Sequence, residues 1–188
     1  RVRRQRQMCI RDRKEVVKDF EERSRREAEG PQMRVVRLAK NVGLGRALAE
    51  GLRHCGCELV ARMDTDDVMV KGRIGRQYDF MVGHGDVDVC GAWIDEFRDE
   101  GGRRVVVATR KLPEEHEDIV AFGKGRNPMN HPVVMFRKGK VEEAGSYRHF
   151  MLFEDYYLWV RMLMRGCRMH NLQESLLLFR QCEDCLLY

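Results

Sequence analysis

Residues 58–67 read Glu-Leu-Val-Ala-Arg-Met-Asp-Thr-Asp-Asp, and this stretch decides the fold. An apolar run of strand character ends in three carboxylates, Asp64, Asp66 and Asp67, within four residues. Three like charges are not buried without partners, so we expect them at a turn that follows a strand. Carboxylate oxygens in such a turn suit a hard divalent cation, Mn²⁺ or Mg²⁺. The ligand expected on such a cation is a diphosphate.

The acidic turn also has two simpler interpretations. The three carboxylates could form a solvated turn that caps the next helix, which is common for an isolated Asp-x-Asp. A calcium-binding EF-hand loop would need Gly at its sixth position and Glu at its twelfth. Counted from Asp64, these positions hold Met69 and Gly75, which excludes the EF-hand.

Composition indicates one soluble globular domain. The chain has 188 residues, of which 43% are hydrophobic and 35% charged, and no apolar run approaches the roughly 20 residues of a membrane span. Residues 1–13 hold six Arg and one Asp and so account for the whole net charge of +5. The remaining residues sum to zero, which argues against a nucleic-acid partner. The seven Cys show no zinc-ribbon spacing and suit a reducing cytoplasm.

The ends of the chain have an unusual character. Residues 4–12 read Arg-Gln-Arg-Gln-Met-Cys-Ile-Arg-Asp and resemble a translated sequencing-adapter read-through, and residues 185–188 resemble the start of the matching tail. We therefore expect a non-native basic extension over 1–13, a domain over 14–180, and a non-native or truncated tail over 181–188. A natural basic arm is the alternative.

The order of expected elements predicts an α/β fold. A charged helix is expected over 14–29. After it, a strand (34–38), a glycine turn (40–45), a helix (46–53) and the strand before the acidic turn form a unit that argues for parallel pairing. Further elements are expected over 71–82 (a helix with Ile74, Tyr78 and Met81 at core spacing), 87–93 and 103–108 (a hairpin), 110–131 (a loop), 133–137 (a strand), 138–144 and 156–164 (helices), and 168–172 and 175–180 (strands).

The glycine turn offers a competing hypothesis. A strand, Gly43-x-Gly45, a helix and then Asp64 superficially match a dinucleotide-binding fingerprint. The third glycine of that fingerprint should stand at Leu48, and ribose recognition needs a single acid rather than a cluster. Otherwise Gly43 and Gly45 simply provide a tight turn with positive φ.

A second pair of acids, Glu154 and Asp155, lies between Phe153 and two tyrosines. Helix capping could explain one acid, since a carboxylate in a first turn stabilises the helix dipole by about 0.3–1 kcal/mol. Two adjacent acids in an aromatic setting also suit a general base. His131, in the run Asn-His-Pro, is either structural or a loop residue that faces a ligand, and Trp159 is expected in the core.

Four motifs in order resemble bacterial family-two glycosyltransferases of the GT-A fold. They are Asn-Val-Gly-Leu-Gly at 41–45, Ala-Arg-Met-Asp-Thr-Asp-Asp at 61–67, Asn-Pro-Met-Asn-His-Pro-Val-Val-Met-Phe-Arg at 127–137 and Phe-Glu-Asp-Tyr-Tyr-Leu-Trp at 153–159. The resemblance runs from about residue 14 to about residue 180. It implies a mixed, mostly parallel sheet flanked by helices, incomplete at the N-terminus.

The resemblance implies inverting transfer of a sugar from a nucleotide-diphosphate donor, with UDP expected, to a hydroxyl of a glycan or lipid-linked acceptor. Asp66 would hold the cation, Asp64 would lie near the ribose or the metal, and Asp155 would be the base, assisted by Glu154. The residues expected to bind substrate are Asn41, Gly43, Arg62, Asp64, Asn130 and His131. The implied setting is polysaccharide or lipopolysaccharide synthesis, in the cytoplasm or at the inner face of the membrane, with room for peripheral membrane association.

The chain departs from the family pattern at both ends. The family normally begins with a strand, a helix and a second strand that help to bind the nucleotide base, whereas this sequence starts at the following helix. Beyond residue 180 a polar, often His-containing stretch is replaced by Gln-Cys-Glu-Asp. A catalytically inactive sugar-nucleotide-binding module is therefore kept as an alternative, and the dinucleotide-binding oxidoreductase fragment as a weaker one.

Overall fold

The computed structural model describes residues 15–24, 26, 30 and 32–181, which fall into two units, Arg1–Asn41 and Val42–Tyr188. In the first unit residues 15–24 are helical, as the sequence predicts, and Met33 N donates to Ser24 Oγ (2.7 Å). Residues 32–38 have no regular secondary structure, so the predicted strand 34–38 is wrong. A strand needs a neighbour for its backbone groups, and the extended β-branched pattern alone does not supply one. The predictions for 1–13 and 182–188 fall outside the described residues.

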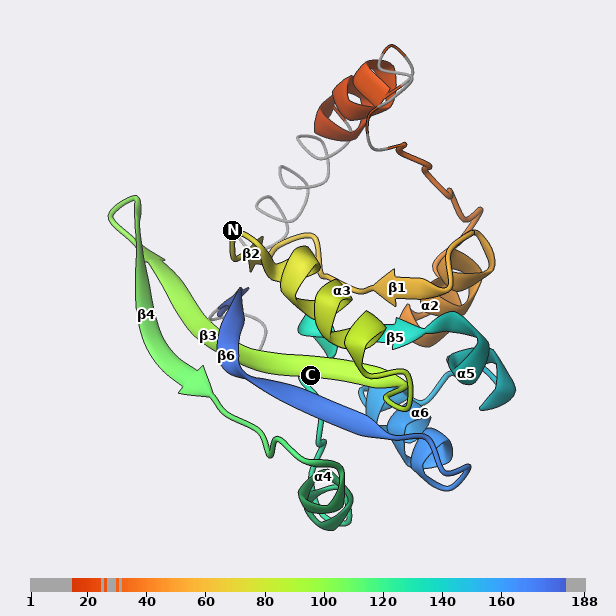
Figure 1. The fold of residues 1–188 in the computed structure, drawn as a ribbon. Coiled ribbons are helices and arrows are strands. Elements are labelled where there is room, and N and C mark those ends of the chain that lie inside the picture. The colour runs from red at the N-terminus through yellow and green to blue at the C-terminus, as the bar shows by residue number, and fades with distance from the viewer. Residues whose placement is uncertain (1–14, 25, 27–29, 31, 182–188) are drawn as a thin grey trace. The chain divides into compact units, whose positions relative to one another are not determined.

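The second unit alternates helices and strands (Figure 1). Its elements are α2 (Leu44–Arg53), β1 (Leu59–Ala61), β2 (Val68–Met69), α3 (Arg73–Gly83), β3 (Val89–Glu100), β4 (Arg103–Arg110), α4 (His116–Phe122), the 3₁₀ turn η1 (His131–Val133), β5 (Met135–Arg137), α5 (Lys138–Glu143), α6 (Glu154–Leu163) and β6 (Met169–Arg180). The predicted loop 110–131 thus contains α4. The two short strands predicted near the end form one long strand, β6.

The strands form one mixed sheet of order β1-β5-β3-β6-β2, with β4 paired to β3. Helices flank this sheet, which confirms the predicted α/β class. The expectation of mostly parallel pairing is wrong for the described strands, because β3–β6 is parallel and the other four pairs are antiparallel. The reason is that β1 pairs with β5, not with the segment 34–38 that precedes it in the chain.

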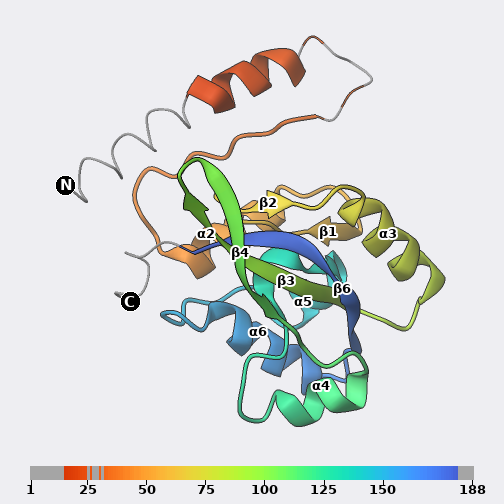
Figure 2. The ribbon, with the colours of Figure 1, turned by 90° about the vertical axis from the view of Figure 1, so that its left-hand side faces the viewer.

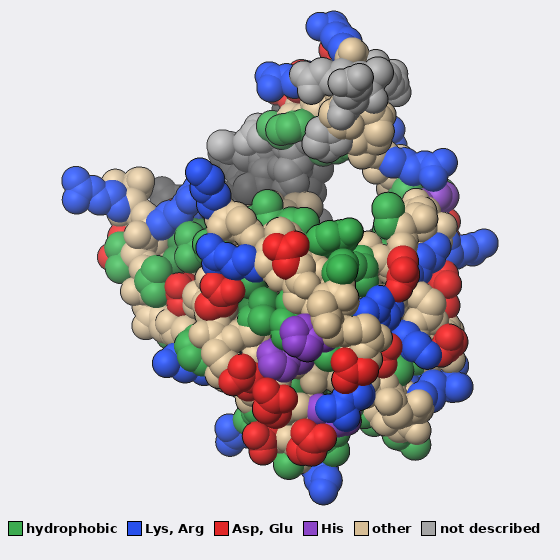
Figure 3. Space-filling view, viewed as in Figure 1, with side chains coloured by type: hydrophobic (Ala, Val, Ile, Leu, Met, Phe, Trp, Pro, Cys, Tyr) green, Lys and Arg blue, Asp and Glu red, His purple; other side chains and the backbone are tan. Residues whose placement is uncertain are grey.

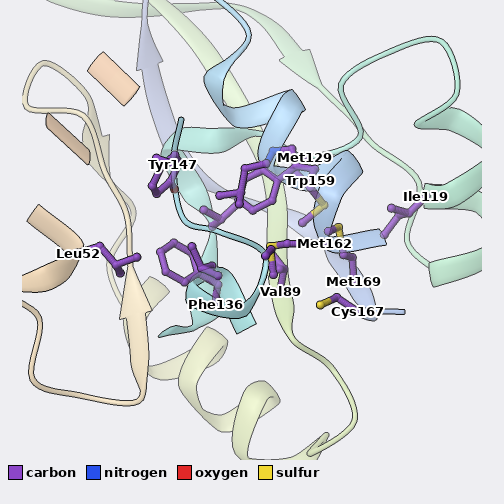
Figure 4. Close-up of a cluster of buried hydrophobic side chains, with 14 residues drawn as sticks. Leu52, Val89, Ile119, Met129, Phe136, Tyr147, Trp159, Met162, Cys167 and Met169 are labelled. Atoms are coloured by element: carbon purple, nitrogen blue, oxygen red, sulfur yellow. The ribbon is translucent and has the colours of Figure 1, made fainter. Parts of the chain in front are cut away.

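Alternate residues of the central strands face two separate layers. Val89 of β3 packs in a cluster with side chains of α2, α4, α5, α6 and β5, which Figure 4 shows in close-up. The next residue, Cys90, packs instead with Met81 of α3 and Met135 of β5. Within the second unit the sheet therefore has α3 on one face and α2, α4, α5 and α6 on the other (Figure 2). Trp159, expected in the core, is fully buried.

The helix α3 turns a polar face toward the sheet. Its buried residues are Arg73, Gln77 and Met81, whereas Ile74 and Tyr78 are 42% and 52% exposed. The predicted core stripe was therefore right for Met81 and wrong for Ile74 and Tyr78. Two faces of this helix, an apolar one and a polar one, repeat with the same helical period. The polar face is the buried one, because its side chains donate hydrogen bonds to backbone carbonyls of the sheet and its loops.

The surface of the second unit is mixed in charge. In the view of Figure 3, acidic and basic side chains are interspersed, and histidines lie beside acidic groups. Among the helices that the structure describes, none has the length and apolar character needed to cross a bilayer.

Candidate active site

The acidic turn begins with a paired Arg and Asp. Arg62, which is 8% exposed, donates from Nη1 and Nη2 to the two oxygens of Asp64 at 2.7 and 2.6 Å. Such a two-pronged guanidinium–carboxylate contact fixes both groups. Arg62 itself is held because its N–H donates to Val134 O (2.9 Å). The carboxylate predicted to bind substrate or metal is thus already oriented by the residue two positions before it.

The other end of the turn is held by strand β6. Arg180 donates its N–H to Asp67 Oδ1 (3.0 Å) and its Nε to Asp66 O (2.9 Å). Asp66 keeps an exposed side chain, whereas Asp67 is buried and its Oδ2 has no hydrogen-bond partner among the described residues. Burial, with smaller contributions from Asp64 and Asp66, raises the pKa of Asp67 to about 6.

Arg73 of α3 joins this turn to a second loop, and the sequence did not reveal it. Its guanidinium is 1% exposed and donates to Arg62 O (2.7 Å) and Pro132 O (3.3 Å). Burial, aided by the positive charge of Arg62, lowers the pKa of Arg73 to about 10. Gln77, one turn later, donates to Cys90 O and Val133 O. The signal that could have identified Arg73 is the pair of polar residues Arg73 and Gln77, which lie four residues apart on one face of the predicted helix.

The second acidic site opens helix α6. Glu154 and Asp155 occupy its first turn, and both side chains are half-buried. Asn127 donates from Nδ2 to Asp155 Oδ2 at 2.6 Å. The amide orientation of Asn127 is fixed because its Oδ1 accepts the Met129 N–H (3.3 Å). Asn127 begins the motif at 127–137, but the sequence alone does not identify it as a site residue.

The two remaining loop candidates are more buried than expected. Asn130 is 3% exposed, and its Nδ2 donates hydrogen bonds to the carbonyls of Ala92 (3.0 Å) and Arg110 (3.3 Å). These bonds fix the loop against β3 and β4. His131 is 7% exposed, and its Nε2 lies 3.0 Å from Tyr147 Oη. Burial, with a contribution from Arg62, lowers the pKa of His131 well below its ordinary value. The imidazole is therefore neutral near pH 7.

Tyr147 connects the two acidic sites. Burial is the main cause of its raised pKa, and the charges of Asp155 and Asp64 also raise it, whereas Arg62 lowers it. The contacts of Tyr147 agree with these directions, because its hydroxyl lies 3.0 Å from Nε2 of His131 and its side chain lines a hollow together with Arg62. Tyr147 thus contacts neighbours of both motifs, Arg62 beside Asp64 and His131 beside the Asp155 cavity.

The glycine turn packs against the segment that precedes α6, at Arg148 and His149. Gly43 has φ +81°, the left-handed conformation that favours glycine, as the tight-turn interpretation predicts. Gly45 lies inside α2 and has no positive φ, so the interpretation is wrong for Gly45. A Cβ on Gly45 would lie 2.5 Å from Arg148 O and 3.3 Å from Glu154 Cβ, so only glycine allows this approach. Asn41, the other predicted binding residue of this motif, belongs to the first unit.

A cavity of about 410 Å³ lies beside Asp155. Its lining contains three predicted site residues, Asn130, His131 and Asp155, and Asn127 as well. A smaller hollow of about 280 Å³, between α2 and β1, is lined by Arg62 and Tyr147. Asp64 and Asp66 line neither. The geometry thus separates a cavity with an oriented carboxylate from an exposed acidic turn.

No group of three His, Cys, Asp or Glu that could hold a metal occurs among the described residues. The acidic turn nevertheless offers hard oxygen donors: the carboxylate of Asp66 is exposed, and Oδ2 of Asp67 has no hydrogen-bond partner among the described residues. Mg²⁺ and similar ions are commonly held by one or two carboxylates, and substrate phosphates complete the shell. The residues present therefore fit a cation that arrives with a diphosphate.

The family model and the relatives found by comparison with known proteins agree on one family. The model of "Glycosyl transferase family 2" matches residues 11–145. A relative from Erwinia amylovora, amylovoran biosynthesis glycosyltransferase AmsE, is 42% identical over 150 residues, which are 80% of this chain and 55% of the relative. An Escherichia coli UDP-Gal:alpha-D-GlcNAc-diphosphoundecaprenol beta-1,3-galactosyltransferase is 39% identical over 139 residues, 74% of this chain and 50% of the relative. The chain spans about half the length of these relatives.

Solved structures agree at the level of the fold. S. aureus TarS 1–349 in complex with UDP-GlcNAc has a TM-score of 0.59 at 16% identity and covers 80% of this chain and 42% of its own. Mannosyltransferase PcManGT from Pyrobaculum calidifontis, in complex with GDP-Man and Mn²⁺, has a TM-score of 0.55 at 13% identity, over 78% and 39% of the two chains. At these identities the similarity shows the fold alone.

Proposed function

The chain belongs to glycosyl transferase family 2, and from this we propose that it is the partial catalytic domain of an inverting glycosyltransferase that uses a UDP-sugar in bacterial polysaccharide or lipopolysaccharide synthesis. The observation that carries the proposal is the position of Tyr147 between the two acidic sites. Tyr147 lines one hollow with Arg62, the partner of Asp64, and its hydroxyl lies 3.0 Å from Nε2 of His131, which lines the cavity with Asp155. The UDP donor is proposed because a relative at 39% identity is named for UDP-Gal. The lipid-linked acceptor and peripheral membrane association are proposed because that relative's acceptor is a diphosphoundecaprenol-linked sugar.

In the proposed reaction Asp155 acts as the base. An acceptor hydroxyl gives its proton to the Asp155 carboxylate while its oxygen bonds to the anomeric carbon of the donor. The bond from that carbon to the diphosphate oxygen breaks on the opposite side, and the nucleoside diphosphate leaves with the electron pair. One displacement inverts the anomeric centre. General-base assistance of this kind is typically worth about 10²–10⁴-fold in rate.

The other residues position these groups. Asn127 fixes the Asp155 carboxylate by its 2.6 Å hydrogen bond. Glu154, which precedes the base on α6, is proposed to assist it or to position the acceptor. Asn130 and His131 shape the cavity wall, and neutral His131 adds no charge to it. Gly43, in the turn before α2, is proposed to border the donor.

The acidic turn is proposed as the donor site. Asp66, with its exposed carboxylate, and Asp64, held by Arg62, would hold Mn²⁺ or Mg²⁺. Such a cation, when bound, neutralises the charge that develops on the departing diphosphate as a Lewis acid. The protein's own contribution is to keep three carboxylates in place despite their repulsion, through Arg62 and Arg180.

A calorimetric titration of UDP with and without Mn²⁺ tests the donor site. We expect Mn²⁺-dependent binding that Asp66→Asn abolishes and that Asp79→Asn, an exposed carboxylate of α3, leaves unchanged. UDP binding that does not depend on Mn²⁺, or that is retained in Asp66→Asn, would contradict the assignment of the acidic turn as the donor site. UDP-sugar binding without transfer to any acceptor would favour the inactive binding module. Family membership removes the support for a dinucleotide-binding oxidoreductase.

A further inference from the structure

The cavity beside Asp155 contains cations that the proposed reaction does not use. Its volume of about 410 Å³ lies in the range of small-ligand sites. Its cationic lining residues are Arg110, Lys111 and Arg126. Arg110 is the last residue of β4 and Lys111 follows it, and Arg126 comes from the loop after α4. Two separate segments thus bring positive charge to the cavity that holds the proposed base.

The charges on this cavity do not cancel. Arg110 pairs with Glu96 and lies over the ring of Phe179 (5.6 Å), so its charge is partly used within the protein. Lys111 lies over the ring of Trp93 at 4.5 Å, a contact that leaves its charge unneutralised. No carboxylate of the described residues pairs with Lys111 or Arg126, and Asp155 is the one acid of the lining.

Neutral groups make up the rest of the wall. Asn127 and Asn130 hold internal bonds, and His131 is uncharged because burial lowers its pKa. A neutral sugar hydroxyl needs no surplus positive charge for binding. A phosphate ester does, because lysine and arginine are its usual partners in proteins.

We infer that this cavity is the acceptor subsite and that Lys111 and Arg126 bind a phosphate or diphosphate ester carried by the acceptor sugar. The inference rests on the proposed function, since Asp155 must face the acceptor. It deepens that function by assigning the acceptor's charge to two residues. The simpler alternative is that both cations are solvated side chains at a cavity rim, which bind no ligand.

The test measures sugar binding by two-dimensional NMR on the whole chain, with EDTA present and no nucleotide. N-acetylglucosamine 1-phosphate, glucose 1-phosphate, the two neutral methyl glycosides and inorganic phosphate are the probes. We expect a phosphorylated sugar to shift amide signals of the cavity wall, including those of Lys111 and Asn127. It should bind about tenfold or more tightly than its methyl glycoside, the scale of one charge-assisted contact.

Matched variants locate the effect. Lys111→Gln with Arg126→Gln should lower the affinity for the phosphorylated sugar at least tenfold. The control is Lys124→Gln with Arg103→Gln, which removes two exposed cations that do not line the cavity. If the first variant does not fold, a salt titration of the wild type replaces it, because added NaCl should weaken binding of the phosphorylated sugar and not of the glycoside.

Four results would overturn the inference: no binding of either phosphorylated sugar at millimolar concentration, equal binding of the neutral glycosides, equal losses in both variants, or inorganic phosphate binding as well as the sugar phosphates. The last would mean that the cations attract any anion. The assay needs neither donor nor metal, so its outcome is separate from the UDP titration. UDP binding without sugar-phosphate binding would remove this inference and leave the proposed function.

Discussion

The acidic turn and the cavity acid are held in opposite ways. Around the turn, Arg62 engages both oxygens of Asp64, Arg180 holds Asp66 and Asp67, and Arg73 fixes a carbonyl of the same segment. In the cavity, the hydrogen bonds of the described residues reach Asp155 at one oxygen, Oδ2. A turn that presents fixed charge benefits from many supports, whereas a base must keep an oxygen available for a proton.

The largest effect should come from the sparsely held acid. Asp155→Asn removes the base but keeps a side chain of the same size beside Asn127, so we expect the rate of sugar transfer to fall about 10²–10⁴-fold. UDP affinity should stay the same, because Asp155 lies in the cavity and not in the acidic turn. The measurement is initial-rate transfer together with a UDP titration.

Asp118→Asn, an exposed acid of α4, is the control for that measurement. Transfer that continues at the wild-type rate in Asp155→Asn would show that another group takes the proton. A parallel loss of UDP affinity would show that the two regions are one site and would break the comparison.

The next effect concerns the support that both regions share. Arg73→Met leaves the buried carbonyls of Arg62 and Pro132 without their donor, so the free energy of unfolding should fall by about 3 kcal/mol. Arg76→Met on the same helix removes an exposed guanidinium that pairs with exposed Glu174, and should change it by less than about 0.5 kcal/mol. Urea denaturation of the three proteins measures both changes. Equal losses in the two variants would mean that Arg73 contributes no more than a surface arginine.

The sequence predicted best where the signal is local. The apolar run before three acids predicted β1 and its turn, and the acids after Phe153 predicted the start of α6. It failed where the partner is distant. Asn127 reaches Asp155 across 28 residues, and nothing in its own neighbourhood indicates this contact.

The predictions of strand pairing and of the buried face of α3 failed for related reasons. The choice of β5 as the partner of β1 depends on the whole sheet, so a local strand-turn-helix-strand unit suggested parallel neighbours that are not formed. Arg73 looks like a surface residue because the apolar stripe of Ile74, Tyr78 and Met81 has the same period. Only the carbonyls that Arg73 meets in the folded chain make the polar register the buried one.

The smallest effect would show what the many supports of the turn leave unsatisfied. Asp67 has its pKa raised to about 6 by burial, so the folded chain holds a proton that the unfolded chain, with its carboxyl near 3.8, has released. The folded state binds more protons between these values, and the stability that Asp67 contributes is therefore lost as pH rises from about 4 to about 6. Asp67→Asn should match the wild type near pH 4 and exceed its unfolding free energy by about 2 kcal/mol near pH 7.

The control is Asp66→Asn. Because the side chain of Asp66 is exposed, its unfolding free energy should stay within about 0.5 kcal/mol of the wild type at both pH values. Denaturant titrations at the two pH values decide the matter: a constant difference between Asp67→Asn and the wild type would mean that the buried carboxylate is compensated, and that the turn holds all three of its charges equally well.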